Sequence, residues 1–245
     1  MNPKLRHRGP RRHRSGAALL ILITVVGLAA ASLLVGALGR SSGELTRERR
    51  TLQALALANE ALIGFAVVNG RLPRPAMSAI DGRENPAPCQ SELACTGLLP
   101  WLTLGLEAGD SWGKLLRYSV TPEFTVAPIQ SVQAVATKTV QSRDGDGRLR
   151  YLAGHAECTL AAECAPLVVF SNGKNNLGVD LRGMTQANAS NANPDEQANH
   201  DAAVHFISRP ASADASVAGG EFDDLLTWVP LGRLFNQMRA AGSLP

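Results

Sequence analysis

Residues 17–39 read AALLILITVVGLAAASLLVGALG, and no side chain in this run carries a charge. Its only polar side chains are those of Thr24 and Ser32, whose hydroxyls can hydrogen-bond to helix carbonyls. At about 1.5 Å per residue the run forms a helix of roughly 35 Å, enough to cross a bilayer core of about 30 Å. The sequence therefore predicts a single membrane-spanning helix.

The segment before this run is strongly basic. Residues 1–16, MNPKLRHRGPRRHRSG, hold six of the 24 Lys and Arg and no acidic residue. This order predicts a cytoplasmic N-terminus, with the rest of the chain across the membrane. The rest of the chain holds 18 basic and 21 acidic residues, although the whole chain has a net charge of +3. The basicity therefore belongs to the leader, and no later basic face indicates nucleic-acid binding.

Three interpretations of the apolar run stay open. It could be a permanent anchor, or a secretory signal peptide cut near Ala37-Leu38-Gly39, where small residues are suitably spaced. It could also follow a leader that is cut on the cytoplasmic side, before the apolar run. The run is longer than the usual signal-peptide core of about 7–15 residues, which disfavours the second interpretation.

The next segment, residues 40–68, continues the helix with an amphipathic pattern. It contains no proline before the Asn69-Gly70 stop signal, and Pro73 follows. We therefore predict one helix over residues 17–68, apolar first and amphipathic later; two helices broken near residues 41–43 are the alternative. The apolar stripe of the second half is predicted to be Leu45, Leu52, Leu55, Leu62 and Ile63.

This N-terminal arrangement resembles that of type IV pilins and of the pseudopilins of type II secretion. A short basic leader ends in Gly16, and the apolar segment begins at once with Ala17. The resemblance implies cleavage between these two residues by prepilin peptidase and methylation of the new N-terminus. It also implies a single-span protein of the bacterial inner membrane, whose body lies in the periplasm or in an envelope filament.

Three later segments are similar to short motifs of the major pseudopilin. Residues 110–118, DSWGKLLRY, resemble its D-x-W-G-x-x-x-x-Y segment. Residues 170–176, FSNGKNN, resemble the S-x-G-x-D-G turn that follows. Residues 222–228, FDDLLTW, resemble its closing segment, in which an acidic residue precedes a tryptophan.

One position departs from the family pattern. Most members carry glutamate at the fifth position after the cut, and here that position is Ile21. A carboxylate within a membrane is costly and is retained for a partner, so its absence removes one docking contact. The resemblance thus favours a minor, capping or initiating subunit.

The partners that the resemblance implies are other pilin-like subunits, prepilin peptidase and an inner-membrane assembly platform. Helix packing would use the small residues Gly27, Ala30 and Gly36.

Residues 69–109 form a proline-rich connector, in which regular helix or central strand is not expected over much of the length. Cys89 and Cys95 lie within it, and Cys158 and Cys164 have the same separation later in the chain. In a periplasmic body two local disulfides, 89–95 and 158–164, are the economical assignment, although four cysteines allow three pairings. Five intervening residues exceed the usual C-x2-4-C spacing of a zinc site.

Residues 110–245 are predicted to form an antiparallel sheet packed on the soluble half of the N-terminal helix, an α+β fold that is pilin-like by resemblance. A polar loop is expected between Lys174 and His200. Alternating patterns predict strands at residues 114–124, 132–141, 149–153, 166–173 and 202–208. A short C-terminal helix should bury Leu231, Leu234, Phe235 and Met238.

Residues with catalytic potential are few, and we predict no catalytic site and no resident cofactor. Asp144-Gly-Asp146-Gly resembles the opening of a calcium loop, but the remaining ligands are missing, so a hairpin turn is favoured. Calcium stays a candidate because the major pseudopilin binds it near its C-terminal loops. The acidic residues of the comparable region are Asp195, Glu196, Asp201, Asp223 and Asp224.

The sequence thus favours a structural subunit of a type II secretion or type IV pilus filament. One alternative is a signal-anchored periplasmic binding domain with no filament role. The other is a secreted hydrolase, which would need a site at His155 or His200 with an acidic partner.

Overall fold

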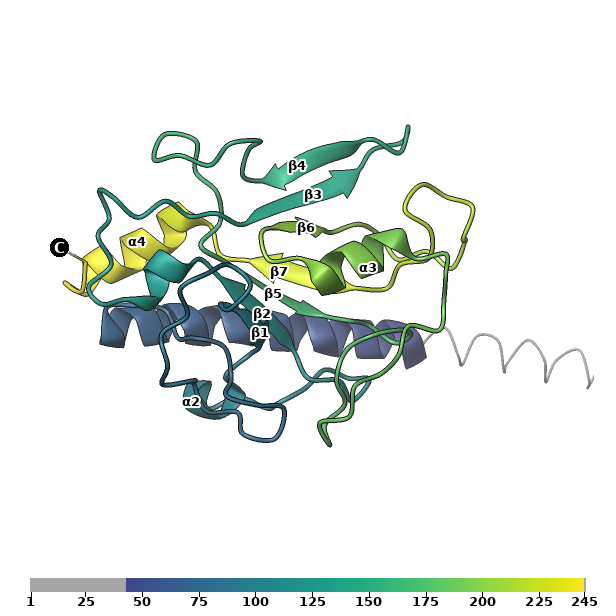
Figure 1. The fold of residues 1–245 in the computed structure, drawn as a ribbon, viewed down its shortest axis with the longest axis horizontal. Coiled ribbons are helices and arrows are strands. Elements are labelled where there is room, and N and C mark those ends of the chain that lie inside the picture. The colour runs from purple at the N-terminus through teal and green to yellow at the C-terminus, as the bar shows by residue number, and fades with distance from the viewer. Residues whose placement is uncertain (1–42, 245) are drawn as a thin grey trace, which may run out of the picture. The chain divides into compact units, whose positions relative to one another are not determined.

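The computed structural model describes residues 43–244 (Figure 1). Residues 47–245 form one compact unit of mixed α and β structure, which agrees with the predicted α+β class. The leader 1–16 and the apolar run 17–39 lie outside the described residues. The same holds for the predicted cleavage and packing residues Gly16, Ala17, Gly27, Ala30 and Gly36.

The described chain opens with a helix, Gly43–Asn69, which ends where the sequence predicts. Gly70 follows with a φ of 67°, and its N–H donates to the carbonyl of Ala66. The buried stripe differs from the predicted one, since Leu45 and Leu52 are 53% and 44% exposed. The packing face is rotated about the helix axis away from them. It consists of Thr51, Leu55, Ala58, Asn59, Leu62, Ile63 and Ala66.

The strands form two sheets (Figure 1). The larger is antiparallel with the order β1-β2-β5-β7, and the smaller has the order β4-β3-β6. The single antiparallel sheet predicted is therefore two sheets, and β3 pairs with β6 in parallel. A parallel pair needs a long crossover, which residues 144–204 supply. The bounds are β1 (Thr96–Leu98), β2 (Arg117–Val120), β3 (Thr139–Arg143), β4 (Leu149–Ala153), β5 (Leu167–Ser171), β6 (His205–Ile207) and β7 (Leu225–Trp228).

Two hydrophobic clusters lie on either side of β5, and every residue of this strand is buried. The larger cluster includes Leu62, Val169 and Leu234, so it joins the N-terminal helix, the larger sheet and the C-terminal helix α4 (Leu231–Ala240). The smaller cluster includes Phe170 and Phe206, whose ring centroids are 5.7 Å apart.

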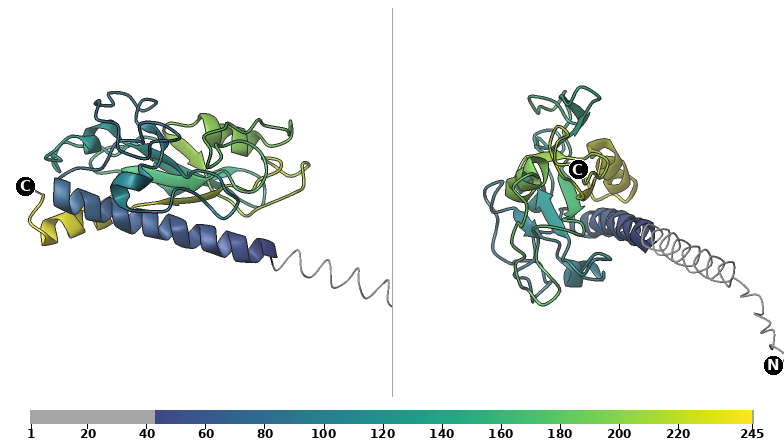
Figure 2. Two further views of the ribbon diagram at one scale, coloured as in Figure 1. Left: turned by 90° about the horizontal axis from the view of Figure 1, so that it is seen from below. Right: turned by 90° about the vertical axis from the view of Figure 1, so that its right-hand side faces the viewer.

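The C-terminal helix α4 buries the four side chains predicted for it. It lies beside the N-terminal helix on the same side of the larger sheet (Figure 2), and Arg233 of α4 donates to Glu60 at 2.6 Å. The soluble part of the N-terminal helix is therefore packed against the sheet, as predicted.

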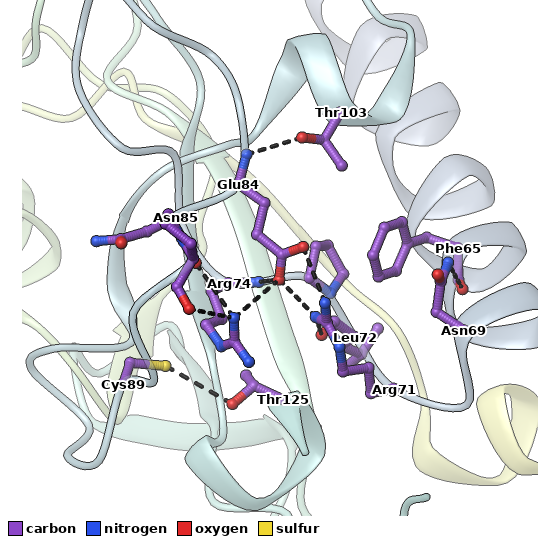
Figure 3. Close-up of polar contacts among 12 residues, drawn as sticks. Phe65, Asn69, Arg71, Leu72, Arg74, Glu84, Asn85, Cys89, Thr103 and Thr125 are labelled. Atoms are coloured by element: carbon purple, nitrogen blue, oxygen red, sulfur yellow. Dashed lines mark hydrogen bonds and ion pairs between the residues drawn. The ribbon is translucent and has the colours of Figure 1, made fainter. Parts of the chain in front are cut away.

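The connector after the helix is held by a carboxylate at its centre (Figure 3). Glu84 accepts two hydrogen bonds from the Arg71 guanidinium, at 2.5 and 3.0 Å, and one from the main-chain N–H of Arg74 at 2.8 Å. Arg71 also lies 5.3 Å from the ring centroid of Phe65, which ties the connector to the helix. The connector nevertheless contains β1 and a short helix, α2 (Trp101–Leu104).

Four of the five predicted strands are shorter in the structure, whereas β4 has the predicted bounds. The strands expected at 166–173 and 202–208 are reduced to β5 and β6. The strand expected at 114–124 is reduced to β2, because Pro122 begins the 3-10 helix η1 (Pro122–Thr125). The strand expected at 132–141 begins only at Thr139. Part of the polar segment predicted as a loop is helical, since Pro194 starts α3 (Pro194–Asp201), and proline favours the first turn.

Candidate functional site

The segments that carry the three later sequence motifs meet at one end of the larger sheet. Residues 110–116 precede β2, residues 172–176 follow β5, and residues 222–224 precede β7. Strand β5 pairs with both β2 and β7 in antiparallel register. Because antiparallel neighbours alternate in direction, these three loops lie at the same end, around the side chain of Lys114.

Asp110 organises the first loop. Its Oδ1 accepts the main-chain N–H groups of Trp112 and Lys114, each at 2.9 Å, which closes a tight turn. Its Oδ2 accepts the hydroxyl of Ser171 at 2.5 Å, and that hydroxyl accepts the N–H of Gly173 at 3.0 Å. One aspartate therefore fixes the first loop and joins it to the second.

Lys114 is buried at the centre of this site, with 1% of its surface exposed. Its ammonium donates to the main-chain carbonyls of Asn172, Asn175 and Asn176, at 3.1, 2.6 and 2.9 Å. An ammonium has three protons, so each proton has a carbonyl acceptor.

The second loop requires glycine where it approaches the third. Gly173 has a φ of 58°, and a Cβ there would lie 2.2 Å from both the carbonyl oxygen and the Oδ1 of Asp223. A side chain would therefore force the two loops apart. The close approach of Asp223 therefore explains why the FSNGKNN segment has glycine at position 173.

Three carboxylates gather beside Lys114. Oxygens of Glu196, Asp223 and Asp224 lie within 4.8 Å of one another. The main-chain N–H of Asp223 donates to Glu196 at 2.8 Å, and Asp223 accepts the N–H of Asn175 at 2.9 Å. Such oxygens are the ligands that calcium prefers, so these residues could hold a divalent cation.

Burial changes the protonation of this cluster. Burial, reinforced by the charge of Glu196, raises the pKa of Asp223 to about 6. Burial also raises the pKa of Asp224 well above its ordinary value, against a hydrogen bond from Asn199. Burial lowers the pKa of Lys114, although the surrounding carboxylates oppose this shift. The carboxyl groups of Asp223 and Asp224 therefore keep their protons to higher pH than exposed ones.

The other two acidic residues considered for calcium do not join the cluster. Asp195 is buried and accepts hydrogen bonds from Arg143, at 2.6 and 2.8 Å, and from Arg209 at 2.8 Å. Burial raises its pKa, but these hydrogen bonds outweigh burial and lower it. Asp201 is exposed at the end of α3.

Sequence reasoning also missed Lys114, whose type and spacing gave no signal for a buried ammonium.

A second buried lysine is paired with a residue of the first disulfide loop. Cys89 pairs with Cys95 and Cys158 with Cys164, which are the local pairings expected. The carboxylate of Glu92, within the first disulfide loop, forms an ion pair with Lys138, which is fully buried. The first disulfide loop thus supplies the counter-charge of an interior lysine.

The other candidates from the sequence are the segment at residues 144–147 and two histidines, of which His155 is exposed. The segment Asp144-Gly-Asp146-Gly forms the hairpin turn between β3 and β4, as predicted, with the N–H of Asp144 donating to the carbonyl of Arg148 at 2.9 Å. His200 lies beside Arg117, with 3.2 Å between Nδ1 and the guanidinium. Burial lowers the pKa of His200, and the charge of Arg117 adds to this effect.

Among the described residues, one helix, Gly43–Asn69, is long and apolar enough to cross a membrane. This assignment rests on length and composition alone, and the core helix of a soluble protein can be equally long and apolar. The chain matches no protein-family profile, no curated protein and no solved structure.

Proposed function

We propose that this chain is a structural subunit of a filament of the type II secretion or type IV pilus kind, with prepilin-type cleavage after Gly16. The observation that carries the proposal is the helix Gly43–Asn69. It buries one face against a β-rich body and leaves the other face in solvent, and it follows a chargeless run preceded by a basic leader. A filament subunit needs this combination, because the apolar end must pack with other helices while the body is carried outside.

The two surfaces of the helix suit different partners. The inner face packs into the body, whereas Leu45, Leu52 and Leu57 stay 53%, 44% and 61% exposed. Exposed leucines on an amphipathic helix supply apolar contacts for neighbouring subunits. Isoleucine at position 21 in place of glutamate favours a minor subunit, at a cap or an initiation point.

The two disulfides indicate an oxidising compartment for the body. We place the body on the periplasmic side of the inner membrane or in the filament itself. Assembly, rather than catalysis, is its proposed role.

The N-terminal residue of the mature protein tests the proposal. Full-length chain is purified from its native membrane, and intact mass and N-terminal peptides are measured. A start at Ala17, with or without a methyl group, is expected. Gly16→Val should leave the leader uncut, whereas Gly9→Val, a matched change within the same leader, should leave cleavage intact.

Two other results would overturn the proposal. A start at Arg40 would identify an ordinary exported protein. An intact Met1 in the native membrane would identify a signal-anchored domain with no filament role.

A further inference from the structure

The loop that follows β5 has a backbone that needs an internal support. Among the residues that the structure describes, Leu177 is the one non-glycine with a positive φ, at 60°. Gly173 and Gly178, at 58° and 88°, are also left-handed. A non-glycine residue in this conformation is strained and persists only where its surroundings impose it.

This backbone directs its carbonyl groups at one point. The carbonyls of Asn172, Asn175 and Asn176 all reach the Nζ of Lys114, within 3.1 Å. Several carbonyls that converge from one short loop, with carboxylates behind them, are the surroundings in which proteins hold hard cations. Acidic groups that act on the charge of Lys114 belong to Asp223, Asp110, Asp224 and Glu196, and oxygens of Glu196, Asp223 and Asp224 lie within 4.8 Å of one another.

A buried ammonium without such surroundings would be strongly destabilising. Here the lysine stem crosses the interior, the charge is fully hydrogen-bonded, and Asp223 binds the same loop through the N–H of Asn175 at 2.9 Å. Lysine and loop therefore stabilise one another.

We propose that the ammonium of Lys114 is a built-in cation, which holds the 172–178 loop against the start of β7 in the position that a bound metal ion would otherwise take. This contact between Lys114 and the loop belongs to the fold of the body and does not depend on filament assembly. It makes the arrangement of this loop independent of free calcium.

Hydrogen exchange of the 172–178 amides in the full-length protein in detergent tests the proposal. Lys114→Ala removes the cation and leaves space, whereas Lys114→Met removes the charge and keeps the volume. Both should speed exchange in the loop by about 10- to 100-fold, because hydrogen bonds to a charged donor are lost. Millimolar calcium should restore slow exchange in Lys114→Ala, while sodium chloride of equal ionic strength should not.

Lys138→Ala is the matched control. Lys138 is also fully buried, but its ammonium donates to Glu92 and to a single carbonyl, that of Ala203, at 2.7 Å. Loss of the Lys138 side chain should destabilise the protein, and calcium should not restore its stability, because a single carbonyl accepts from this ammonium.

Three outcomes would overturn the proposal. The first is exchange of the loop amides at the wild-type rate in Lys114→Met, which would show that the side chain only fills space. The second is a Lys114→Ala variant that calcium does not restore. The third needs no variant and applies even if the variants do not fold: in the unaltered protein, calcium and chelator should give the same exchange in the loop, and protection by calcium would show that a metal is required there.

Discussion

The side-chain amide of Asn59 donates a hydrogen bond of 2.9 Å to the hydroxyl of Thr227, which lies 168 positions later in the chain. The same amide reaches the carbonyl of Trp228 at 3.3 Å. A polar side chain on the buried face of the N-terminal helix thus binds the last strand of the larger sheet. This contact fixes the rotation and the axial position of the helix, which apolar packing alone would leave loosely defined.

Replacing Asn59 with alanine should lower the free energy of unfolding by about 1–2 kcal/mol, because two acceptors of β7 lose their donor. Asn69→Ala is the control, since Asn69 is exposed and bonds only to Phe65 on its own helix. Its cost should stay below about 0.5 kcal/mol. Thermal unfolding of the full-length protein in detergent measures both, and equal costs would contradict the assigned role of Asn59.

Two leucines of the same helix should differ sharply. Leu62→Ala removes a fully buried side chain from the larger cluster and should cost about 2–5 kcal/mol. Leu57 is 61% exposed, and its substitution by alanine should change stability by less than about 0.5 kcal/mol. Chemical denaturation measures the difference. A costly Leu57→Ala in the isolated protein would mean that the helix packs on the body by another face.

Two arginines test whether the ion pair at α3 is structural. The side chain of Arg209 is 6% exposed, pairs with buried Asp195, and lies 4.4 Å from the ring centroid of Phe222. Arg209→Ala should cost about 3 kcal/mol, because the carboxylate loses one of its two partners. The side chain of Arg150 is 70% exposed in its pair with Asp144, so Arg150→Ala should cost less than about 1 kcal/mol. Similar losses in unfolding experiments would refute this ranking.

The two disulfides should contribute unequally. Each closes a short loop and should stabilise the fold by about 2 kcal/mol through the unfolded chain. Replacing Cys89 and Cys95 with serine should cost more than replacing Cys158 and Cys164. The reason is that the first loop also carries Glu92, which pairs with the buried Lys138, and an opened loop would hold this carboxylate less firmly against the lysine. The unfolding temperatures of the two double variants decide this, and a larger loss for the second pair would contradict it.

The acidic cluster should give the protein a pH dependence of known sign. The pKa of Asp223 is about 6 in the folded protein, above the ordinary value of 3.8 for this side chain. The folded state therefore binds the proton more tightly, and this group's contribution to stability falls as pH rises through about 4 to 6.

Asp223→Asn should remove that part of the pH dependence, so the unfolding temperature of the variant should fall less than that of the wild type over this range. Asp146→Asn, a change in the exposed β3–β4 turn, should leave the wild-type profile unchanged. Parallel profiles for wild type and Asp223→Asn would rule out the predicted titration.

Features that depend on neighbours in the chain were predictable. The helix end at Asn69-Gly70 follows from local turn chemistry, and the β3–β4 hairpin follows from Asp-Gly at residues 144–147. The buried face of α4 follows from helical spacing. The start of α3 shows the limit, because a proline at residue 194 in a polar segment indicates a loop and a helix start equally well.

The sequence by itself determined the end of the long helix, the buried face of the C-terminal helix, and the leader pattern that suggests processing, since each depends on residues a few positions apart. It favoured the local disulfide pairings but left three pairings open. Only the tertiary structure decided which face of the long helix is buried, that the strands divide into two sheets, and that Lys114 meets the Asn172–Asn176 carbonyls, 58 to 62 positions away. Such contacts leave no periodic signal, because they arise where separate loops are brought to the same end of a sheet.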